Sequence, residues 1–435
     1  MAEPLRIALA GLGTVGTGVI ELLETNRSLI EGRAGRAIEI VAVNARDRAR
    51  DRGVDLTPYA WVDDMQAMAQ RADVDVVLEL VGGSDGPALT LARAALDAGK
   101  GFVTANKAMI AHHGLALAEQ AALRGAPLKF EAAVAGGIPV VKGLREGAAA
   151  NRIERIYGIL NGTCNYILSE MGRTGADFGE MLQAAQDKGY AEADPTFDID
   201  GIDAAHKLAI LAAIGFGARV DFDAVAATGI REVRAADITQ AGALDYVIRL
   251  VGIASLDESD GAKRLLQRVR PCLVARGHPL AAVTGPTNAV VAEGNFSGRL
   301  LFQGAGAGAG PTASAVVADL IDIARGDLGA PFSVPVGELE PFAPADAGNR
   351  VGRDYIRFTV NDRPGVLAEI TAAMRDAEVS IESLIQRGRD HAGGEVLVAM
   401  VTHEGPERCV TKALELLDGS PSLTAPPLVM PILKD

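Results

Sequence analysis

The chain has 435 residues, too many for one compact core, so we expect two or three domains. Its formal net charge of -14 leaves no basic excess to neutralise phosphates, which excludes nucleic acid as the main partner. The cysteines Cys164, Cys272 and Cys409 lie far apart and form no CxxC pair, as is typical of a reducing compartment. The strongly apolar segment 208–216 is too short to span a bilayer, and a strand that begins by Leu5 argues against a signal peptide. We therefore expect a cytoplasmic protein without a membrane partner.

The first 139 residues alternate apolar stretches with helical patterns. Strands are predicted at residues 5–10, 38–43, 74–81, 102–105 and 128–134, and helices at 17–24, 87–98 and 114–124. The near-continuous apolar character of residues 74–81 is typical of a parallel sheet. This order predicts an α/β fold with a Rossmann-type, doubly wound parallel sheet.

The rest of the chain divides into three parts. Longer helices at 179–188 and 202–214, with β-prone stretches at 264–273 and 289–293, predict an α+β substrate and dimerisation domain over residues 140–303. A glycine run at 304–310 opens a helix to residue 325, and we expect residues 304–327 to complete the first domain. Prolines indicate a linker over residues 328–350. Residues 351–435 follow a βαββαβ-like order.

The strongest motif is Gly11-Leu12-Gly13-Thr14-Val15-Gly16, which follows the first strand directly and opens a helix. Glycine permits a tight turn and a close approach of the backbone to a pyrophosphate, and the helix N-terminus offers free N–H groups. The alternative is a strand–helix turn without a ligand. The position in a βαβ series favours a dinucleotide cofactor bound by these six residues.

The end of the second strand bears on the choice of cofactor. An acidic side chain there would bind the ribose hydroxyls of NAD, but the sequence has Asn44. Arg46 and Arg48 are placed to meet a 2′-phosphate, so NADP is favoured and NAD is the alternative. Two solvated arginines beside Asp47 would give the same pattern.

The densest polar segment covers residues 189–207. Asp203 and Lys207 lie four apart on a predicted helix and share a face that continues to apolar Ile210 and Leu211, so we expect partial burial. A lysine beside a carboxylate in a cleft can donate a proton to a developing alkoxide, whereas a surface ion pair is the plain alternative. A calcium-binding EF-hand loop is rejected because Lys207 stands where a bidentate glutamate is needed.

Two further groups are candidates for the chemistry. Lys107 ends the motif Thr104-Ala105-Asn106-Lys107 after a predicted strand, and ligands of doubly wound folds lie beyond the carboxyl ends of strands. Lys107 is therefore expected to point into the crevice, although a solvated loop lysine is the alternative. Cys164, in Asn161-Gly162-Thr163-Cys164-Asn165, suggests a rival covalent mechanism like that of aldehyde dehydrogenases, but no histidine lies near it in sequence.

Together these segments resemble the homoserine dehydrogenase family, with similarity over most of residues 5–325. The matching stretches are the glycine turn and residues 104–107, 131–139, 158–166, 189–207 and 304–319. The family interconverts L-homoserine and L-aspartate 4-semialdehyde with NAD(P)(H). The resemblance implies that Lys207 is the proton donor, that Asp203 is its partner, and that Lys107 is a second catalytic lysine near cofactor and substrate.

The same resemblance assigns the remaining site residues. Glu192 would hold the substrate ammonium group with Asp198 close to the substrate, Gly308 would touch the cofactor, and Cys164 would be structural. The backbone carbonyls of Val134, Gly136 and Ile138 would bind a sodium ion, and carbonyl oxygens suit a hard cation. A non-catalytic amino-acid sensor is an alternative, but Glu192, Asp198, Asp203 and Lys207 form a complete set against it.

The C-terminal segment 361–370, Asn-Asp-Arg-Pro-Gly-Val-Leu-Ala-Glu-Ile, resembles an ACT domain. Such domains pair across subunits and bind amino acids at the glycine-containing strand–helix turn. We therefore expect a homodimer or homotetramer with feedback control by L-threonine. A dimerisation module without a ligand is the alternative. The family resemblance places the enzyme in threonine, methionine and isoleucine biosynthesis.

Overall fold

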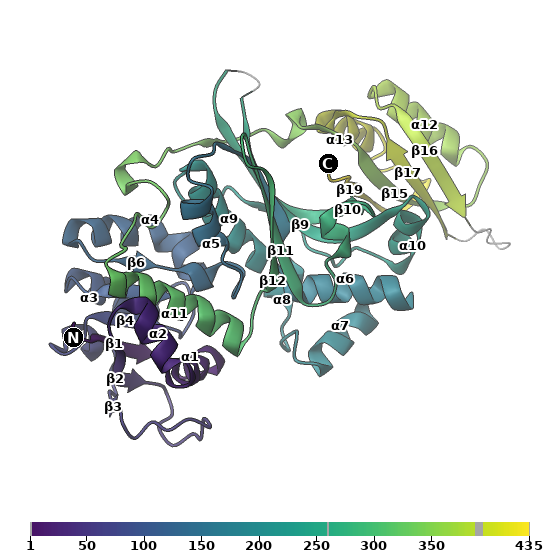
Figure 1. The fold of residues 1–435 in the computed structure, drawn as a ribbon. Coiled ribbons are helices and arrows are strands. Elements are labelled where there is room, and N and C mark those ends of the chain that lie inside the picture. The colour runs from purple at the N-terminus through teal and green to yellow at the C-terminus, as the bar shows by residue number, and fades with distance from the viewer. Residues whose placement is uncertain (1, 259–260, 388–394, 435) are drawn as a thin grey trace.

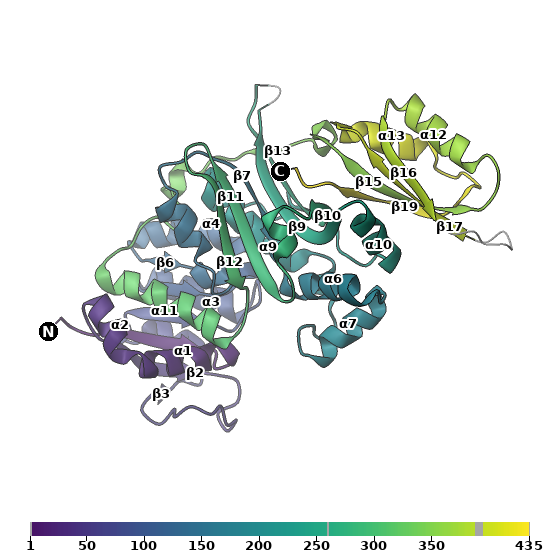
Figure 2. The ribbon, with the colours of Figure 1, turned by 45° about the vertical axis from the view of Figure 1, so that its right-hand side comes forward.

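The computed structural model describes residues 2–258, 261–387 and 395–434. Three main sheets lie along the molecule, with the N-terminal sheet at one end, the C-terminal sheet at the other and a large mixed sheet between them (Figures 1 and 2). Across the described ranges, no helix is long and apolar enough to cross a membrane.

The N-terminal sheet is parallel throughout, with the order β3-β2-β1-β4-β5-β6. Its strands are β1 (Leu5–Ala10), β2 (Ile38–Asn44), β3 (Ala60–Trp61), β4 (Val76–Glu79), β5 (Gly101–Thr104) and β6 (Leu128–Lys129). Successive side chains point to opposite faces of a strand. Ile7 and Leu9 accordingly belong to one buried cluster and Ala8 and Ala10 to another. The predicted doubly wound parallel sheet is confirmed.

Helices cover both faces of this sheet. The cluster that contains Ile7 includes residues of α1 (Thr14–Thr25), α2 (Arg27–Ala34) and α11 (Ala309–Arg325), and the other includes α3 (Pro87–Asp97) and α4 (Lys107–Arg124). Helix α11 follows strand β12 (Gly298–Ala305) of the mixed sheet in the sequence, yet it lies beside α1 and α2 (Figure 1). Helix α11 thus covers the same face of the N-terminal sheet as α1 and α2.

Two sequence predictions in this region were wrong. The strand predicted over residues 128–134 ends at Lys129, because the N–H of Glu131 donates to Asp319 Oδ2 of α11 at 2.9 Å and a short 3-10 turn follows at Glu131–Ala133. Helix α4 begins at Lys107 rather than at residue 114, because the Asn106 side chain accepts a hydrogen bond from Met109 N at 3.0 Å and caps the helix.

The mixed sheet has the order β12-β11-β7-β9-β10-β13, and β8 (Ala226–Ala227) also pairs with β10; the sheet is antiparallel except where β8 and β13 pair with β10 in parallel. Its strands are β7 (Ile153–Ile159), β9 (Tyr246–Asp257), β10 (Arg264–Ala275), β11 (Thr287–Gly294), β12 (Gly298–Ala305) and β13 (Ala343–Pro344). Helix α9 (Ile202–Phe216) packs on β7, β9 and β10, and every residue from 203 to 214 is buried. A helix buried on all sides belongs to the core of a domain.

Part of the segment predicted as a linker packs on the rest of the protein. Phe332 is buried, and its ring centroid lies 5.1 Å from that of Phe130. Residues Ala343–Pro344 then pair with β10 as strand β13. The chain therefore crosses the body of the molecule along a fixed path to the C-terminal unit.

The C-terminal unit has the predicted βαββαβ order. Its elements are β15 (Asp354–Asn361), α12 (Val366–Asp376), β16 (Ile381–Arg387), β17 (Glu395–Thr402), α13 (Glu407–Leu416) and β19 (Leu423–Pro431). Side chains that alternate along β15 face two different parts of the structure. Ile356 and Phe358 face its own core, whereas the Tyr355 hydroxyl donates to Asp237 Oδ1 at 3.0 Å and Arg357 Nη1 lies 2.5 Å from Asp237 Oδ2. Asp237 lies in α10 (Ala235–Ala243), so β15 joins this unit to the mixed-sheet domain.

Candidate active site

Helix α9 holds a carboxylate and a lysine one turn apart, as their i,i+4 spacing predicts. Lys207 Nζ donates to Asp203 Oδ2 at 2.8 Å and to the carbonyl oxygen of Leu160 at 2.7 Å. Lys107 Nζ, from the start of α4, lies 2.7 Å from the other oxygen, Asp203 Oδ1. The Asp203 side chain is only 4% exposed, so one buried carboxylate receives an ammonium group on each oxygen.

This arrangement moves the pKa values of the two lysines in opposite directions. Burial lowers the pKa of Lys207 below its usual value, although Asp203 opposes the shift. Burial also acts to lower the pKa of Lys107, but the charge of Asp203 outweighs it and the pKa is raised. Burial alone would raise the pKa of Asp203, yet Lys207 and Lys107 hold it well below its usual range. Lys207 is therefore the group that gives up its proton more readily.

Asn161 connects the acidic groups of the site. Its Oδ1 accepts a hydrogen bond from Cys164 N at 2.8 Å and caps α6 (Gly162–Thr174). Its Nδ2 lies 2.8 Å from Asp198 Oδ1 and 2.8 Å from Asp203 Oδ2. Burial, together with the charge of Asp203, raises the pKa of Asp198. The motif that contains Asn161 did not predict this role; its one sequence signal is an Asn directly before a helix.

Glu192 and Cys164 occupy different surroundings. Glu192 lies in an exposed loop, where its backbone carbonyl accepts from Gln186 Nε2 at 3.0 Å, and its charge acts to raise the pKa of Lys107. Cys164 is fully buried, and its Sγ donates to the carbonyl oxygen of Asp198 at 3.2 Å. Burial and the charge of Asp198 raise the pKa of the Cys164 thiol well above its usual value, which argues against a thiolate nucleophile.

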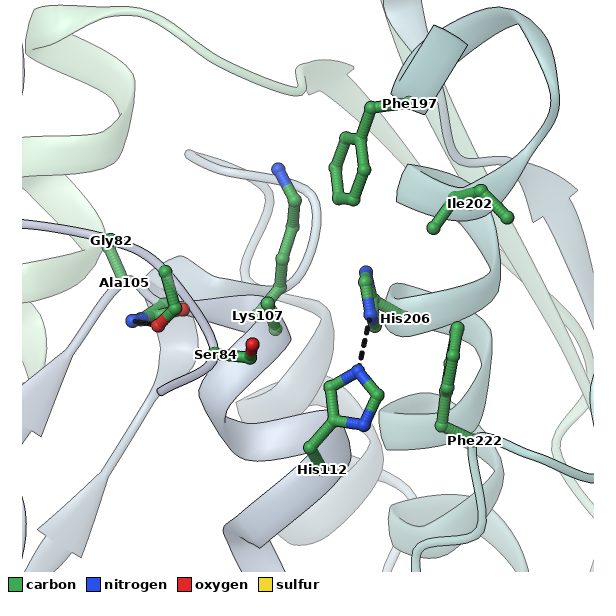
Figure 3. A pocket seen from close by; sticks show the side chains of 12 residues that line it. Gly82, Ser84, Ala105, Lys107, His112, Phe197, Ile202, His206 and Phe222 are labelled. Carbon is green, nitrogen blue, oxygen red and sulfur yellow. Dashed lines mark hydrogen bonds between the residues drawn. The ribbon is translucent and has the colours of Figure 1, made fainter. Parts of the chain in front are cut away.

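A cavity of about 500 Å³ opens between the N-terminal sheet and α9, and Figure 3 shows Lys107 standing in it. The lining residues are Gly82, Gly83, Ser84, Ala105, Asn106, Lys107 and Ala108 with His112 on one side, and Phe197, Ile202, His206 and Phe222 on the other. The Lys107 ammonium lies 5.6 Å from the Phe197 ring centroid. This volume suits a small-molecule site at the carboxyl ends of β4 and β5.

His206 belongs to the wall of this cavity. Its ring stacks on Phe222 with centroids 4.3 Å apart, and its Nε2 lies 3.2 Å from His112 Nε2 (Figure 3). Burial lowers the pKa of His206 to about 4, and His112 adds to the shift. His206 is therefore neutral near pH 7 and packs as a wall residue.

The glycine turn has the shape that a pyrophosphate needs. Gly11 has a φ of 100°, and a Cβ there would lie 2.6 Å from the carbonyl oxygen of Leu80. A Cβ on Gly16 would lie 2.0 Å from the carbonyl oxygen of Gly11, whereas a Cβ on Gly13 would meet nothing within 4 Å. The open side at Gly13 faces the beginning of α1, whose first turn holds no acidic residue. The residues present thus fit a phosphate group at a helix N-terminus.

A second helix begins beside this turn. Gly308 precedes α11, and a Cβ on Gly18 of α1 would lie 2.9 Å from the carbonyl oxygen of Ala309. The N-terminal halves of α1 and α11 therefore touch. This places Gly308 at the same end of the sheet as the glycine turn.

Arginines gather near the end of β2. The Asn44 side chain is occupied, because its Nδ2 donates to Val62 O at 2.7 Å and lies 3.2 Å from Asp63 O. Arg46 is exposed. Arg52, which sequence reasoning missed, donates from Nε to the carbonyl oxygen of Leu12 at 3.1 Å, within the glycine turn. The loop sequence holds several arginines, and nothing in it distinguishes this one.

The segment matched to a sodium site is a buried turn. Ala135 and Gly136 have φ values of 57° and 56°, so the chain reverses there in a left-handed conformation. The carbonyl oxygen of Ile138 accepts from Val140 N at 2.7 Å. Among the described residues, no group of three or more His, Cys, Asp or Glu side chains is placed to hold a metal ion.

Fold and site together define an NAD(P)-dependent oxidoreductase, with a dinucleotide turn after β1 and a lysine–carboxylate group beside a cavity at the ends of β4 and β5. Comparison with protein families agrees. Residues 139–321 match the family model of homoserine dehydrogenase, residues 11–131 match its NAD-binding domain, and residues 355–415 match the ACT domain. The chain belongs to the homoserine dehydrogenase family and acts as an oxidoreductase on a CH–OH group.

Relatives extend the likeness over the whole chain. The homoserine dehydrogenase of Synechocystis sp. is 42% identical and covers 99% of both chains, and that of Pseudomonas aeruginosa is 41% identical over 98% of both. The crystal structure of a homoserine dehydrogenase from Thiobacillus denitrificans has a TM-score of 0.92 at 38% identity and covers 99% of both chains. A hyperthermophilic archaeal homoserine dehydrogenase in complex with NADPH has a TM-score of 0.63 at 26% identity, over 74% of this chain and 97% of that one.

Replacing Asp203 by Asn tests the charge balance of the cleft. Without the carboxylate the pKa of Lys207 in the folded protein falls further below the pKa of about 10.4 that a lysine has in the unfolded chain. At every pH between these two pKa values the unfolded chain binds more protons than the folded one, so stability rises with pH there, and in D203N this pH range is wider. The stability of D203N, lower by about 3–5 kcal/mol at pH 7, therefore rises more steeply with pH than that of the wild type. Urea unfolding between pH 7 and pH 10 measures this.

The control for this test is Asp376→Asn, which changes an exposed pair with Arg375. Its stability curve should run parallel to that of the wild type, because an exposed pair contributes little. If the D203N curve is also parallel to that of the wild type, the Asp203 carboxylate does not set the pKa of Lys207 and the proposed charge balance is contradicted.

Proposed function

We propose that this cleft interconverts L-aspartate 4-semialdehyde and L-homoserine, with Lys207 as the proton donor and acceptor at the substrate oxygen. The observation on which this rests is the Asp203 carboxylate shared by Lys107 and Lys207 at the edge of the cavity. We place the reaction on the route to threonine, methionine and isoleucine, inside the cytoplasm.

The residues divide the chemistry between them. A bound nicotinamide cofactor supplies the hydride for reduction and accepts it in oxidation. Lys207, whose pKa burial lowers, donates a proton to the alkoxide that develops on the carbonyl oxygen and recovers it in the reverse direction. Asp203 fixes the direction of the Lys207 ammonium. Lys107 keeps its charge because Asp203 raises its pKa, and this positive charge stabilises the developing alkoxide.

Acidic side chains on the rim are assigned to the substrate amino group. Glu192 is exposed and Asp198 is held by Asn161, and the charges of both act to raise the pKa of Lys107. Opposite charge attracts an ammonium group, and two separate carboxylates give it direction as well as affinity. We propose that Glu192 binds this group and that Asp198 lies close to it.

Lys207→Ala should lose most turnover, with kcat lower by about 10²- to 10⁴-fold, the usual contribution of a positioned acid–base group. The assay follows nicotinamide absorbance with L-aspartate 4-semialdehyde and reduced cofactor. Cofactor affinity, measured by fluorescence, should be unchanged. The matched control is Lys412→Ala, on the exposed face of α13. Near wild-type turnover in K207A removes Lys207 from the reaction, and wild-type protein without any absorbance change removes the proposed reaction itself.

We propose NADP as the preferred cofactor, bound by Gly11, Leu12, Gly13, Thr14, Val15 and Gly16 with Arg46, Lys107 and Gly308. Asn44 offers no carboxylate to the ribose, and its amide is already engaged by Val62 and Asp63. The guanidinium groups of Arg48 and Arg52 lie 5.6 and 5.9 Å from the Trp61 ring centroid, so two positive charges lie beside β3, which pairs with the end of β2. A 2′-phosphate is the group that benefits from this charge.

Arg46→Ala should raise the KM for NADPH by about 10- to 100-fold, since a hydrogen bond to a charged group contributes about 1.5–3 kcal/mol. The KM for NADH should stay the same, because NADH lacks the 2′-phosphate. Initial rates with both cofactors measure the split, and Arg375→Ala, an exposed arginine of α12, is the control. Equal changes for NADPH and NADH would refute the phosphate contact.

We further propose that the carbonyl oxygens of Val134, Gly136 and Ile138 bind Na⁺ in the left-handed turn, which supports the start of the mixed-sheet domain. Neutral carbonyl ligands suit a hard monovalent cation. Activity in sodium-free buffer, with and without added NaCl at constant ionic strength, tests this.

We also propose a homodimer or homotetramer, which light scattering measures.

The C-terminal unit is proposed as the regulatory domain, with L-threonine as its effector. A cavity of about 390 Å³ lies at the turn between β15 and α12 and is lined by Asn361, Asp362, Arg363, Pro364 and Gly365. The neighbouring carboxylate and guanidinium groups complement the ammonium and carboxylate of a free amino acid. β15 leads from this cavity to Tyr355 and Arg357, which bind Asp237 in the mixed-sheet domain.

L-Threonine should lower the initial rate with a saturable dependence, and Asp362→Ala should weaken this inhibition by about tenfold or more, since the ammonium group loses a charged partner. D-Threonine is the control ligand and Asp376→Ala the control variant. A flat response of the wild-type enzyme leaves the unit only a structural role.

A further inference from the structure

Glu79 is a buried carboxylate outside the group of residues discussed so far. It ends β4, is 0% exposed, and follows the apolar residues Val76, Val77 and Leu78. Burying a charge at the centre of a parallel sheet costs several kcal/mol unless its oxygens are satisfied. A glutamate at this position therefore requires partners of its own.

Two loops supply those partners. Oε1 accepts hydrogen bonds from Val81 N at 2.7 Å and Gly82 N at 2.8 Å, in the loop that follows β4. Oε2 accepts from the Thr104 hydroxyl at 2.6 Å. Glu79 and Thr104 are directly paired residues at the ends of β4 and β5. Both oxygens act as acceptors, which is the pattern of a carboxylate.

The connection continues to the catalytic side of the cleft. The Thr104 hydroxyl accepts from Asn106 N at 2.9 Å, and Asn106 Nδ2 donates to the carbonyl oxygen of Gly83 at 2.7 Å. Asn106 also caps α4, whose first residue is Lys107. The chain of contacts from Glu79 thus closes on the β4 loop and ends one residue before the lysine that binds Asp203.

The β4 loop has little packing of its own at Gly82 and Gly83, although Asp85 at its far end lies 2.8 Å from His113 Nε2 of α4. Gly82 and Gly83 have φ values of 88° and 89°, and a Cβ on Gly82 would meet nothing within 4 Å, so packing does not hold the loop. Gly82, Gly83, Ala105, Asn106 and Lys107 all line the cavity. Moving either loop moves one wall of the cleft relative to α9.

We propose that Glu79 is a positioning residue, which acts through Thr104 to fix the β4 and β5 loops together and so aim Lys107 at Asp203 and the substrate. The proposal rests on the function proposed above for Lys107. The hydrogen bonds of the Glu79 carboxylate go to the Val81 and Gly82 backbone and to Thr104, and none goes to Lys107. Its effect is on geometry, since a small misplacement of a catalytic group costs rate.

The test compares Thr104→Val, Thr104→Ser, Glu79→Gln and the double variant E79Q/T104V. T104V keeps the shape of the side chain and removes the hydroxyl, whereas T104S restores it. E79Q preserves an acceptor for the loop N–H groups but presents an NH₂ group to Thr104. The matched control is Thr359→Val, in the C-terminal unit, which removes a buried hydroxyl that has no hydrogen-bond partner among the described residues.

We expect T104V and E79Q to lower kcat/KM by about 10- to 100-fold, with T104S and T359V close to wild type. The double variant should be no worse than the poorer single variant, because both changes break one link. The alkaline limb of the kcat/KM pH profile should move to lower pH in T104V. A Lys107 ammonium that moves away from Asp203 loses the contact that raises the pKa of Lys107. Cofactor affinity should change less than kcat/KM, because the glycine turn is untouched and Lys107 is one of several proposed cofactor contacts.

Several results would overturn the proposal. These are wild-type kcat/KM with an unmoved alkaline limb in T104V, an equal fall in T104S and T104V, and fully additive losses in the double variant. Thermal unfolding is measured for each protein; if T104V does not fold, a folded and fully active E79Q overturns the proposal as well. An inactive wild-type enzyme would instead refute the proposed function, so the two failures are distinct.

Discussion

The Asp203 carboxylate, shared by two lysines from different domains, is the contact on which the site depends. Lys107 comes from the first residue of α4 in the N-terminal domain, and Lys207 comes from the buried helix α9. An unpaired charge at this depth would cost several kcal/mol, so the domains are constrained to meet where all three groups are satisfied. The cleft between the domains thus has one defined geometry at its chemical end.

Sharing one carboxylate also separates the behaviour of the two lysines. Lys207 is nearly enclosed, and burial lowers its pKa, whereas Lys107 is one-third exposed and its pKa is raised. Groups whose surroundings move their pKa values apart can take different roles in one reaction. The group that releases its proton more easily suits proton transfer, and the group that keeps its charge suits electrostatic stabilisation. Two chemically identical side chains therefore become distinct through their positions alone.

The sequence predicted the parts of this site that depend on short-range order. The i,i+4 spacing placed Asp203 and Lys207 on one face, and the βαβ order placed Lys107 at the edge of the sheet. It did not pair Lys107 with Asp203, because nothing local relates α4 to α9. Asn161 and Arg52 were missed for the same reason. The strand predicted over residues 128–134 was wrong because Glu131 N–H binds Asp319, far along the chain, instead of a strand.

The junction with the C-terminal unit uses the same physics for a different purpose. Glu407 at the start of α13 forms ion pairs with Arg268 and Arg270, each with an N–O distance of 2.9 Å. Asp237 accepts hydrogen bonds from Tyr355 and Arg357. These contacts are enclosed, whereas the Asp203 contact borders a cavity. Because side chains alternate along β15, a slip of one residue would turn Tyr355 and Arg357 away from Asp237. A displacement of this unit that separated β15 from α10 would therefore leave the buried charges of Asp237 and Arg357 unpaired.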